Sequence, residues 1–230
     1  GVARLLAKDG ARLTLSDIRE EDAAALGAEL GADVVSPDAI MAVGCDVFSP
    51  NALGAILDEE GIAKLDCAIV AGGANNQLAG PGNGTTLAER GILMDIGHGG
   101  ASFNFRTARE SMADGLRPFS ISTDLHAHSM ARPVHDMATT IAKLLAVGLP
   151  FDECIRAVTQ APRGFLGLSG RDGLAPGTRA DFTVFDLEDS RVDAMDSQGN
   201  HMVMERMFEP RMTVLGCDAQ PAARRLPPEG

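Results

Sequence analysis

The feature that most limits the folds open to this chain is an alternation of short apolar runs with stretches of helical periodicity. A helix predicted over residues 20–30 ends at Gly31, because glycine is the usual residue after a helix C-terminus. Strands separated by helices favour a parallel, doubly wound sheet. The predicted strands of the first half are bounded by Gly, Pro or Asn and cover residues 11–15, 34–35, 43–48 and 67–71.

The same alternation continues to about residue 160 and then changes. Strands predicted at 91–96 and 119–123 alternate with helices predicted at 104–116, 134–146 and 151–160. From Gly177 onward, short strands follow one another without helices, at 180–185, 202–207 and 212–215. This last segment is predicted to form a small antiparallel unit.

The composition excludes several classes of partner. The 230 residues include 20 Lys and Arg against 32 Asp and Glu, so the net charge is −12. This charge repels nucleic-acid backbones and anionic membrane surfaces. Aromatic residues make up 4% of the chain, with no Trp and no Tyr, which leaves few rings for base stacking. We therefore expect no nucleic-acid partner and no membrane partner.

Cysteine usage and apolar run lengths favour a cytoplasmic location. The four cysteines are far apart and show no CxxC or Cys/His spacing, so we interpret them as buried or free thiols. No run approaches the roughly 18 apolar residues of a membrane span, and no secretion signal is recognisable. The chain begins at Gly1, without Met and inside a helical pattern, which leads us to expect further sequence upstream.

Asp17 is the first candidate binding residue. It follows the predicted strand 11–15, at the place where a doubly wound nucleotide-binding fold carries the acid that binds an adenosine ribose. A carboxylate after a strand is also a common helix N-cap. Taken alone, Asp17 favours the N-cap interpretation.

Three segments of the first half together resemble the leucine, valine and phenylalanine dehydrogenase family. They are residues 11–17 (ARLTLSD), 45–54 (CDVFSPNALG) and 69–78 (IVAGGANNQL). The resemblance runs from Gly1 to about Leu93, and its ANNQL segment is specific to that family.

This resemblance implies NAD as cofactor and assigns roles to particular residues. Asp17 would hold the adenosine ribose, the loop from Cys45 to Asn51 would line the adenosine side, and Asn75 would approach the nicotinamide ribose. The alternative for Asn75 and Asn76 is a turn pair that accepts left-handed backbone.

Two departures from the dehydrogenase pattern weaken these roles. The GxGxxG fingerprint, which lets a pyrophosphate approach a helix N-terminus, should lie just upstream of Val2 and is absent apart from Gly1. The catalytic lysines of the family lie in a separate N-terminal domain that has no counterpart here. We therefore expect weak dinucleotide binding and no oxidative deamination.

His98 and Asp124 are the candidate residues of the second half. Each lies at the end of a predicted strand, in DIGHG (residues 95–99) and STD (residues 122–124). In a (β/α)8 barrel the chemistry lies at the C-terminal ends of strands, so both side chains would face one mouth. Taken alone, one His and one Asp are more typical of a satisfied strand-end pair than of a site.

A second resemblance covers residues from Met94 onward, to the dihydroorotase-like amidohydrolases and their amidohydrolase/deacetylase branch. It is based on segments that include MDIGHG, SFNF, ISTD and PVHDMATT in the first part and AVTQAP and GLAPGTRAD further on, at residues 94–99, 102–105, 121–124, 133–140, 157–162 and 173–181.

This family binds one or two divalent metals, usually zinc, through several His, a carboxylated Lys and an Asp on the eighth strand. The resemblance implies that Asp124 is that metal ligand and also takes a proton during attack on an amide or ester carbonyl. His98, on the seventh strand, would touch a small-molecule substrate. The other ligands have no counterpart here, and a catalytic zinc needs about three protein ligands. We interpret His126, His128 and His135 as exposed or satisfied histidines rather than substitutes.

The two resemblances meet where both families have a helix passing into a parallel strand, at LAERGIL (residues 87–93). The predicted fold is therefore α/β: a partial Rossmann-like parallel sheet running into the last two βα units of a TIM-type barrel, with a small antiparallel β tail. The expected segments are a partial NAD-binding domain, a partial barrel, a small β-sandwich segment and a disordered tail, at 1–93, 94–176, 177–218 and 219–230. Open sheet edges would favour association of copies.

Three hypotheses for function follow. The chain is a metal-dependent hydrolase remnant, or an NAD-binding dehydrogenase remnant, or a recombined sequence without activity. The third is favoured for the chain as it stands, because both resemblances lack essential parts of their active sites.

Overall fold

The structure is a computed structural model, and it describes residues 2–52, 54–75, 77–80, 82–168 and 176–223. The chain divides into two compact units, Gly1–Ile92 and Leu93–Gly230. Some residues used in the sequence arguments lie outside the described residues, namely Gly1, Leu53, Asn76 and the GLA part of the GLAPGTRAD segment.

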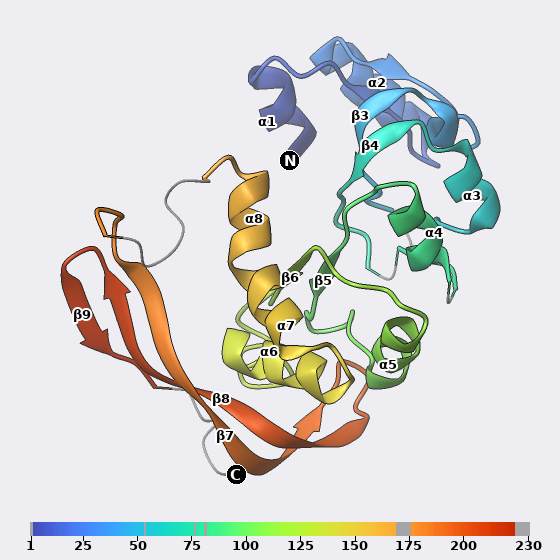
Figure 1. The fold of residues 1–230 in the computed structure, drawn as a ribbon. Helices are drawn as coiled ribbons and strands as arrows, with labels where there is room; N and C mark the ends of the chain where they lie inside the picture. Colours follow the sequence, from blue (N-terminus) through green and yellow to red (C-terminus); the bar gives the residue numbers. More distant parts are fainter. Residues whose placement is uncertain (1, 53, 76, 81, 169–175, 224–230) are drawn as a thin grey trace. The chain divides into compact units, whose positions relative to one another are not determined.

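The first unit is built from short helices and two-stranded parallel sheets (Figure 1). β1 pairs with β2, and β3 pairs with β4, each pair being parallel. The predicted alternation of strand and helix is confirmed, although these strands form two separate pairs instead of one continuous sheet. The elements are α1 (Val2–Lys8), β1 (Thr14–Leu15), α2 (Glu20–Leu30), β2 (Asp33–Val34), the 3-10 helix η1 (Ile40–Ala42), β3 (Cys45–Phe48), α3 (Glu59–Lys64), β4 (Cys67–Val70) and α4 (Asn83–Glu89).

Helix ends in this unit follow local chemistry. α2 ends at Leu30, and Gly31 has the left-handed backbone (φ 64°) that closes a helix without steric cost. α3 begins after Asp58, whose carboxylate accepts a hydrogen bond from the Gly61 N–H at 2.6 Å. The predicted end of α2 at Gly31 is thus confirmed.

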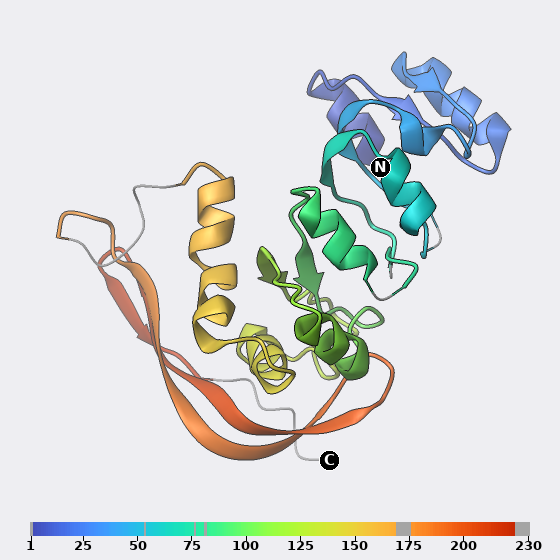
Figure 2. The same ribbon diagram turned by 45° about the vertical axis from the view of Figure 1, so that its right-hand side comes forward.

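In its described residues, the second unit combines one parallel strand pair, four helices and a long antiparallel hairpin. β5 and β6 pair in parallel, while β7, β8 and β9 form an antiparallel sheet. The hairpin of β7 and β8 curves along α6 (Figure 2), which contacts β8. The elements are β5 (Asp95–Gly97), α5 (Phe105–Ala113), β6 (Ser120–Ser122), α6 (Met137–Ala146), α7 (Phe151–Val158), α8 (Gln160–Phe165), β7 (Asp181–Met195), β8 (His201–Leu215) and β9 (Asp218–Pro221).

One predicted helix is divided in the structure. The helix expected over residues 151–160 is interrupted at Thr159, which has φ −131° and ψ −83°, and α8 follows directly. Pro162 explains the break, because a proline ring clashes with the carbonyl four residues earlier, here that of Val158. In α8 the proline lies in the first turn, where its missing N–H is not needed.

The C-terminal strands are longer than expected. The strands predicted at 202–207 and 212–215 are one strand, because a β-bulge near Pro210 shifts the pairing with β7 without ending it. The prediction of a disordered tail from residue 219 is wrong for residues 219–221, which belong to β9 and pair with β8. Residues 224–230 lie outside the described residues.

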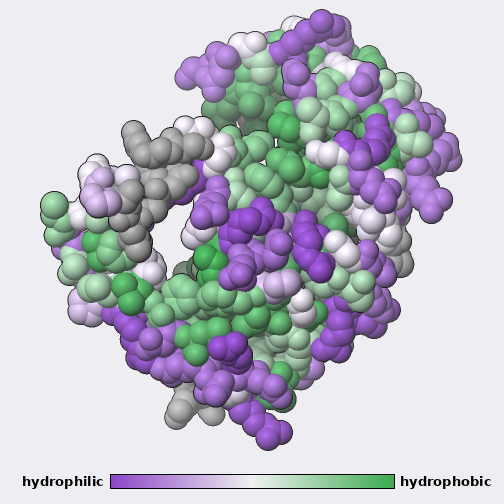
Figure 3. Space-filling view, in the orientation of Figure 1, coloured by the Kyte–Doolittle hydropathy of each residue, from purple (hydrophilic) through white to green (hydrophobic). Residues whose placement is uncertain are grey.

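The core of the second unit lies between the helices and the hairpin. Phe103, Leu144, Cys154, Met204 and Phe208 belong to one cluster of buried side chains drawn from α6, α7, β8 and the loop before α5. Hydrophobic residues also reach the surface around α6, α7 and β8 (Figure 3), including Met137, Phe151 and Val203. None of the described helices combines the length and the apolar character that a membrane span requires.

Truncation of a core side chain should destabilise the second unit. Leu144 has no exposed surface, so Leu144→Ala removes buried methyl groups and leaves a cavity, with an expected loss of about 2–5 kcal/mol in the free energy of unfolding. Urea titration followed by circular dichroism measures this. The control is Leu166→Ala, at a position that is 66% exposed, for which a change of under about 0.5 kcal/mol is expected. Equal losses in the two variants would contradict the position of the core.

Candidate functional site

The C-terminal ends of β5 and β6 form one edge of the parallel pair. Asp95 lies opposite Ser120, and Gly97 lies opposite Ser122. The pairing continues past both strands, because the Gly99 N–H donates to the Thr123 carbonyl at 3.0 Å. Both predicted strand-end segments, containing His98 and Asp124, therefore leave the sheet side by side. We call residues 97–102 and 123–129 the strand-edge site.

Asp124 lies on the exposed side of this edge, directly against Gly99. A Cβ atom built on Gly99 would lie 2.5 Å from Asp124 Oδ2 and 3.4 Å from Ser102 Oγ. Gly99 itself has φ +54°, and Asp124 has φ 47°, which is uncommon for a residue other than glycine. A side chain at position 99 would thus displace the carboxylate, and only glycine fits this contact.

His98 points the other way, into the core. Its side chain has no exposed surface and stacks on the Phe103 ring, with centroids 4.7 Å apart. Nδ1 lies 3.0 Å from the Gly99 carbonyl oxygen, and Nε2 lies 2.8 Å from Lys143 Nζ. Burial, and next the charge of Lys143, lower the pKa of His98 to about 4. The imidazole is therefore neutral and has no ring nitrogen directed toward the exposed edge.

Lys143 is a buried functional group that the sequence analysis missed. It lies in α6 and is 1% exposed. Its ammonium donates to His98 Nε2, to the Met195 carbonyl at 2.7 Å and to the Pro133 carbonyl. Burial lowers its pKa to about 8, against the opposing charges of Asp196 and Asp136. The one signal in the sequence was a lysine within the apolar stretch IAKLLA, residues 141–146.

The remaining histidines do not complete a metal site. His126 lies beside the glycine loop, since a Cβ on Gly100 would be 3.4 Å from its Nε2. The rings of His126 and His128 are 6.0 Å apart, and His135 is half-buried with φ 65°. In the parts of the chain that the structure describes, no three His, Cys, Asp or Glu residues are grouped to hold a metal ion. These residues therefore do not fit the zinc site expected from about three protein ligands.

The first unit places Asp17 two residues after β1. Its Oδ1 accepts a hydrogen bond from the Arg19 N–H at 2.9 Å, and the Arg19 guanidinium lies 3.9 Å away. This turn leads into α2, although the residue before that helix is Arg19. Asp17 is thus exposed at the C-terminal end of a strand, where a ribose-binding acid was expected, and it also stabilises the local turn.

Asn51 and Asn75 lie in the loops that follow β3 and β4. The Asn51 amide oxygen accepts from the Gly73 N–H at 2.9 Å, and its NH2 group donates to the Ser49 carbonyl at 2.9 Å. Asn51 therefore holds two strand-end loops together, and Asn75 is exposed two residues beyond Gly73.

Cys45 lies at the opposite end of β3 from these loops. It is the first residue of the strand and is exposed, facing Cys67 on β4. Partial desolvation of the thiol by its neighbours, and next the interaction with Cys67, raise the pKa of Cys45 above the ordinary thiol value. The structure thus brings Asn51 and Asn75 to the C-terminal ends of β3 and β4, and it leaves Cys45 away from them.

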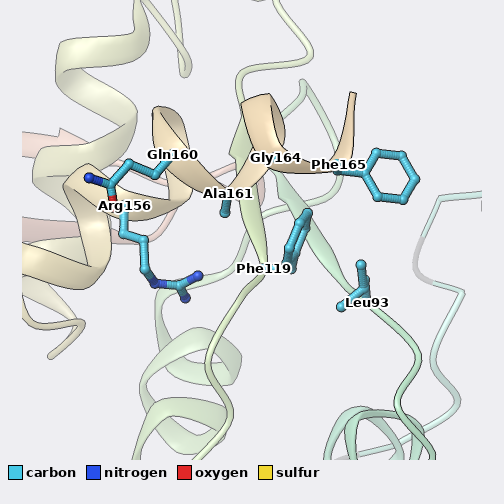
Figure 4. A pocket seen from close by; sticks show the side chains of 7 residues that line it. All are labelled: Leu93, Phe119, Arg156, Gln160, Ala161, Gly164 and Phe165. Carbon is cyan, nitrogen blue, oxygen red and sulfur yellow. The ribbon is translucent and has the colours of Figure 1, made fainter. Parts of the chain in front are cut away.

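A hollow of about 470 Å³ lies near the N-terminal ends of β5 and β6, away from Asp124 (Figure 4). Leu93 and Phe119 precede the two strands, and the Phe165 ring of α8 lies 6.0 Å from that of Phe119. In the (β/α)8 barrel implied by the amidohydrolase resemblance, the chemistry lies at the opposite, C-terminal strand ends. The hollow is therefore not the expected place for catalysis.

Acid should destabilise the protein through His98. The pKa is 6.5 in the unfolded chain and about 4 in the folded one, so between these values mainly the unfolded chain binds the proton. Stability from this group is complete above pH 6.5 and falls as the pH drops toward 4, by about 3 kcal/mol in all. Urea unfolding at pH 7 and pH 4.5 measures the loss. His98→Gln should show a smaller loss over the same interval, and an equal loss in both proteins would contradict the assignment.

Comparison with known proteins identifies both parts of the chain. A model of the amidohydrolase family matches residues 76–221. A deacetylase from Brucella anthropi is 52% identical over 145 residues, which are 61% of this chain and 36% of that protein. A leucine dehydrogenase from Thermoactinomyces intermedius is 48% identical over 88 residues, which are 38% of this chain and 24% of that protein.

A solved structure is similar in fold as well. The crystal structure of a dihydroorotase has a TM-score of 0.67 and 39% sequence identity, covering 87% of this chain and 52% of that one. The chain spans about a third of the length of the deacetylase that it matches. Both resemblances inferred from the motifs are confirmed. The chain belongs to the amidohydrolase family, and it joins this domain to a segment similar to part of the leucine dehydrogenases.

Proposed function

We propose that the second unit is the remnant of a metal-dependent amidohydrolase of the deacetylase branch, with Asp124 as its catalytic carboxylate, and that this chain by itself is inactive. The observation that carries the proposal is the position of Asp124, exposed at the C-terminal edge of β5 and β6 and seated against Gly99. The similarity to deacetylases over 145 residues supports the same reaction class.

The chemistry available to Asp124 is proton transfer. An exposed carboxylate at a strand end can accept a proton from an attacking nucleophile, provided that a substrate carbonyl is held within hydrogen-bond reach. The substrate class is a small molecule with an amide or ester bond. The net charge of −12 argues against nucleic acid as substrate.

His98 enters the proposal as a support for the site. A contact with substrate was expected from the family resemblance, but its ring is buried and both nitrogens are engaged within the protein. Its contribution is to hold the carbonyl of Gly99. This fixes the Gly99 backbone, against which the Asp124 carboxylate lies.

Inactivity of the isolated chain follows from the number of ligands. The family is expected to use zinc, and one carboxylate does not hold zinc tightly. Because the described residues offer no grouped set of three ligands, no hydrolytic step is proposed for this chain alone. Association of copies through exposed sheet edges stays a prediction.

Purified protein without a histidine tag should contain substoichiometric zinc and should hydrolyse no N-acetyl or O-acetyl substrate above the buffer rate. Elemental analysis and an ester-hydrolysis assay measure the two quantities. Asp124→Asn should leave the zinc content and the hydrolysis rate at the same low level. The control Asp114→Asn, at an exposed position after α5, should do the same. A full equivalent of zinc and an esterase rate that are both lost only in Asp124→Asn would show that the site is complete and active.

A second candidate function, nucleotide binding, is favoured by the first unit. Asp17 is exposed after β1, and Asn51 ties together the loops after β3 and β4. Parallel strands bind dinucleotides at their carboxyl ends, which supports Asp17 as the ligand of an adenosine ribose and Asn51 as part of the adenosine side. The phosphates would lack their usual partner, because the sequence contains no GxGxxG.

NADH should therefore bind with a dissociation constant no tighter than about millimolar, or ~4 kcal/mol. Titration of NADH fluorescence, checked by calorimetry, measures the affinity. Asp17→Asn should change the dissociation constant for NADH little at this low affinity. The control, Asp33→Asn in β2, should also change it little. Micromolar binding that is abolished by Asp17→Asn alone would overturn this expectation.

A further inference from the structure

We propose that Lys143 is a positioning residue of the strand-edge site, acting through His98 on the backbone that holds Asp124. The residues involved come from α6, from the loop after β5 and from the segment after β6. The proposal rests on the proposed role of Asp124, but it concerns geometry and is tested without any measurement of hydrolysis.

The ammonium of Lys143 has all three of its N–H donors matched. A protonated lysine has three donors and no acceptor, and its partners here are His98 Nε2 at 2.8 Å, the Met195 carbonyl at 2.7 Å and the Pro133 carbonyl. These partners lie 45, 52 and 10 residues away along the chain. Lys143 therefore joins three separate segments at one buried point.

This arrangement decides which nitrogen of His98 carries the proton. Because Lys143 donates, Nε2 must accept, and in a neutral imidazole the other nitrogen then bears the hydrogen. Nδ1–H is directed at the Gly99 carbonyl oxygen at 3.0 Å. The opposite tautomer would set two donors against each other at Nε2 and would place two acceptors together at Nδ1.

The backbone of Gly99 transmits this restraint to Asp124. Its carbonyl is held by His98 and by the Ser197 hydroxyl at 2.9 Å, while its N–H donates to the Thr123 carbonyl at 3.0 Å. The residue after Thr123 is Asp124, whose carboxylate rests against Gly99. Lys143, His98 and Gly99 thus form a continuous chain of contacts to the proposed catalytic group.

A role in packing alone makes a different prediction. If only the aliphatic stem of Lys143 mattered, methionine would replace it without effect on His98. If the donors matter, Lys143→Met leaves Nε2 without its partner, and the tautomer is no longer determined. The charged groups near the pair are Asp196, at the end of the β7–β8 hairpin, and Asp136, at the start of α6.

The experiment is nitrogen-15 NMR of the full chain, which reports the tautomer of His98 directly. In the unaltered protein at pH 7, His98 should give the signals of a single neutral Nδ1–H tautomer. In Lys143→Met, a mixture of tautomers should appear, and hydrogen exchange of the Gly99 amide should become about tenfold faster. Lys64→Met, at a half-exposed position in α3, is the matched control and should change neither signal.

Two outcomes would overturn the proposal. One is an Nε2–H tautomer in the unaltered protein, a result that stands even if Lys143→Met fails to fold. The other is a folded Lys143→Met protein in which the His98 tautomer and the Gly99 exchange rate are unchanged. Neither readout involves zinc or hydrolysis, so failure of the proposed function leaves this test intact.

Discussion

The buried ammonium of Lys143 is the interaction on which the second unit depends most. A charge taken out of water costs several kcal/mol unless it is paired and hydrogen-bonded. Here three acceptors, from His98, Pro133 and Met195, offset that cost. The Asp196 carboxylate, held in turn by backbone N–H groups, favours the charged form. All these segments must be in place before Lys143 can be buried, so burial of the charge and formation of the site are coupled.

The sequence predicts those features of the fold that local chemistry decides. α2 ends where Gly31 can adopt left-handed backbone, and the alternation of strands and helices follows from apolar spacing. Features that depend on partners are harder to predict. The break at Thr159 is a local feature that apolar periodicity does not predict, because the periodicity runs through this residue and Pro162 lies beyond the expected helix end. The two strands expected at 202–207 and 212–215 are joined into one, because β8 passes Pro210 with a bulge and keeps its pairing with β7.

The candidate site also contains one feature that local sequence predicts and one that depends on distant residues. The position of Asp124 just beyond a strand end could be predicted, because the motif around it is local. The orientation of the His98 side chain could not be predicted, because a histidine between two glycines can point to either face of the strand end. Its orientation is decided by Phe103 and by Lys143, and the latter is 45 residues away. A lysine within an apolar helix is the clue that sequence reasoning could have used.

Orientation of the carboxylate and completion of a metal site are physically separate requirements. The groups that orient Asp124 are Gly99, His98, Lys143 and Ser197, all within the second unit. A metal site requires about three ligands that meet in space, and the described residues supply no such group. The strand edge can therefore keep its geometry without the chemistry that this geometry serves. Because fold alone does not imply function, the number of ligands decides whether such an edge is a working site.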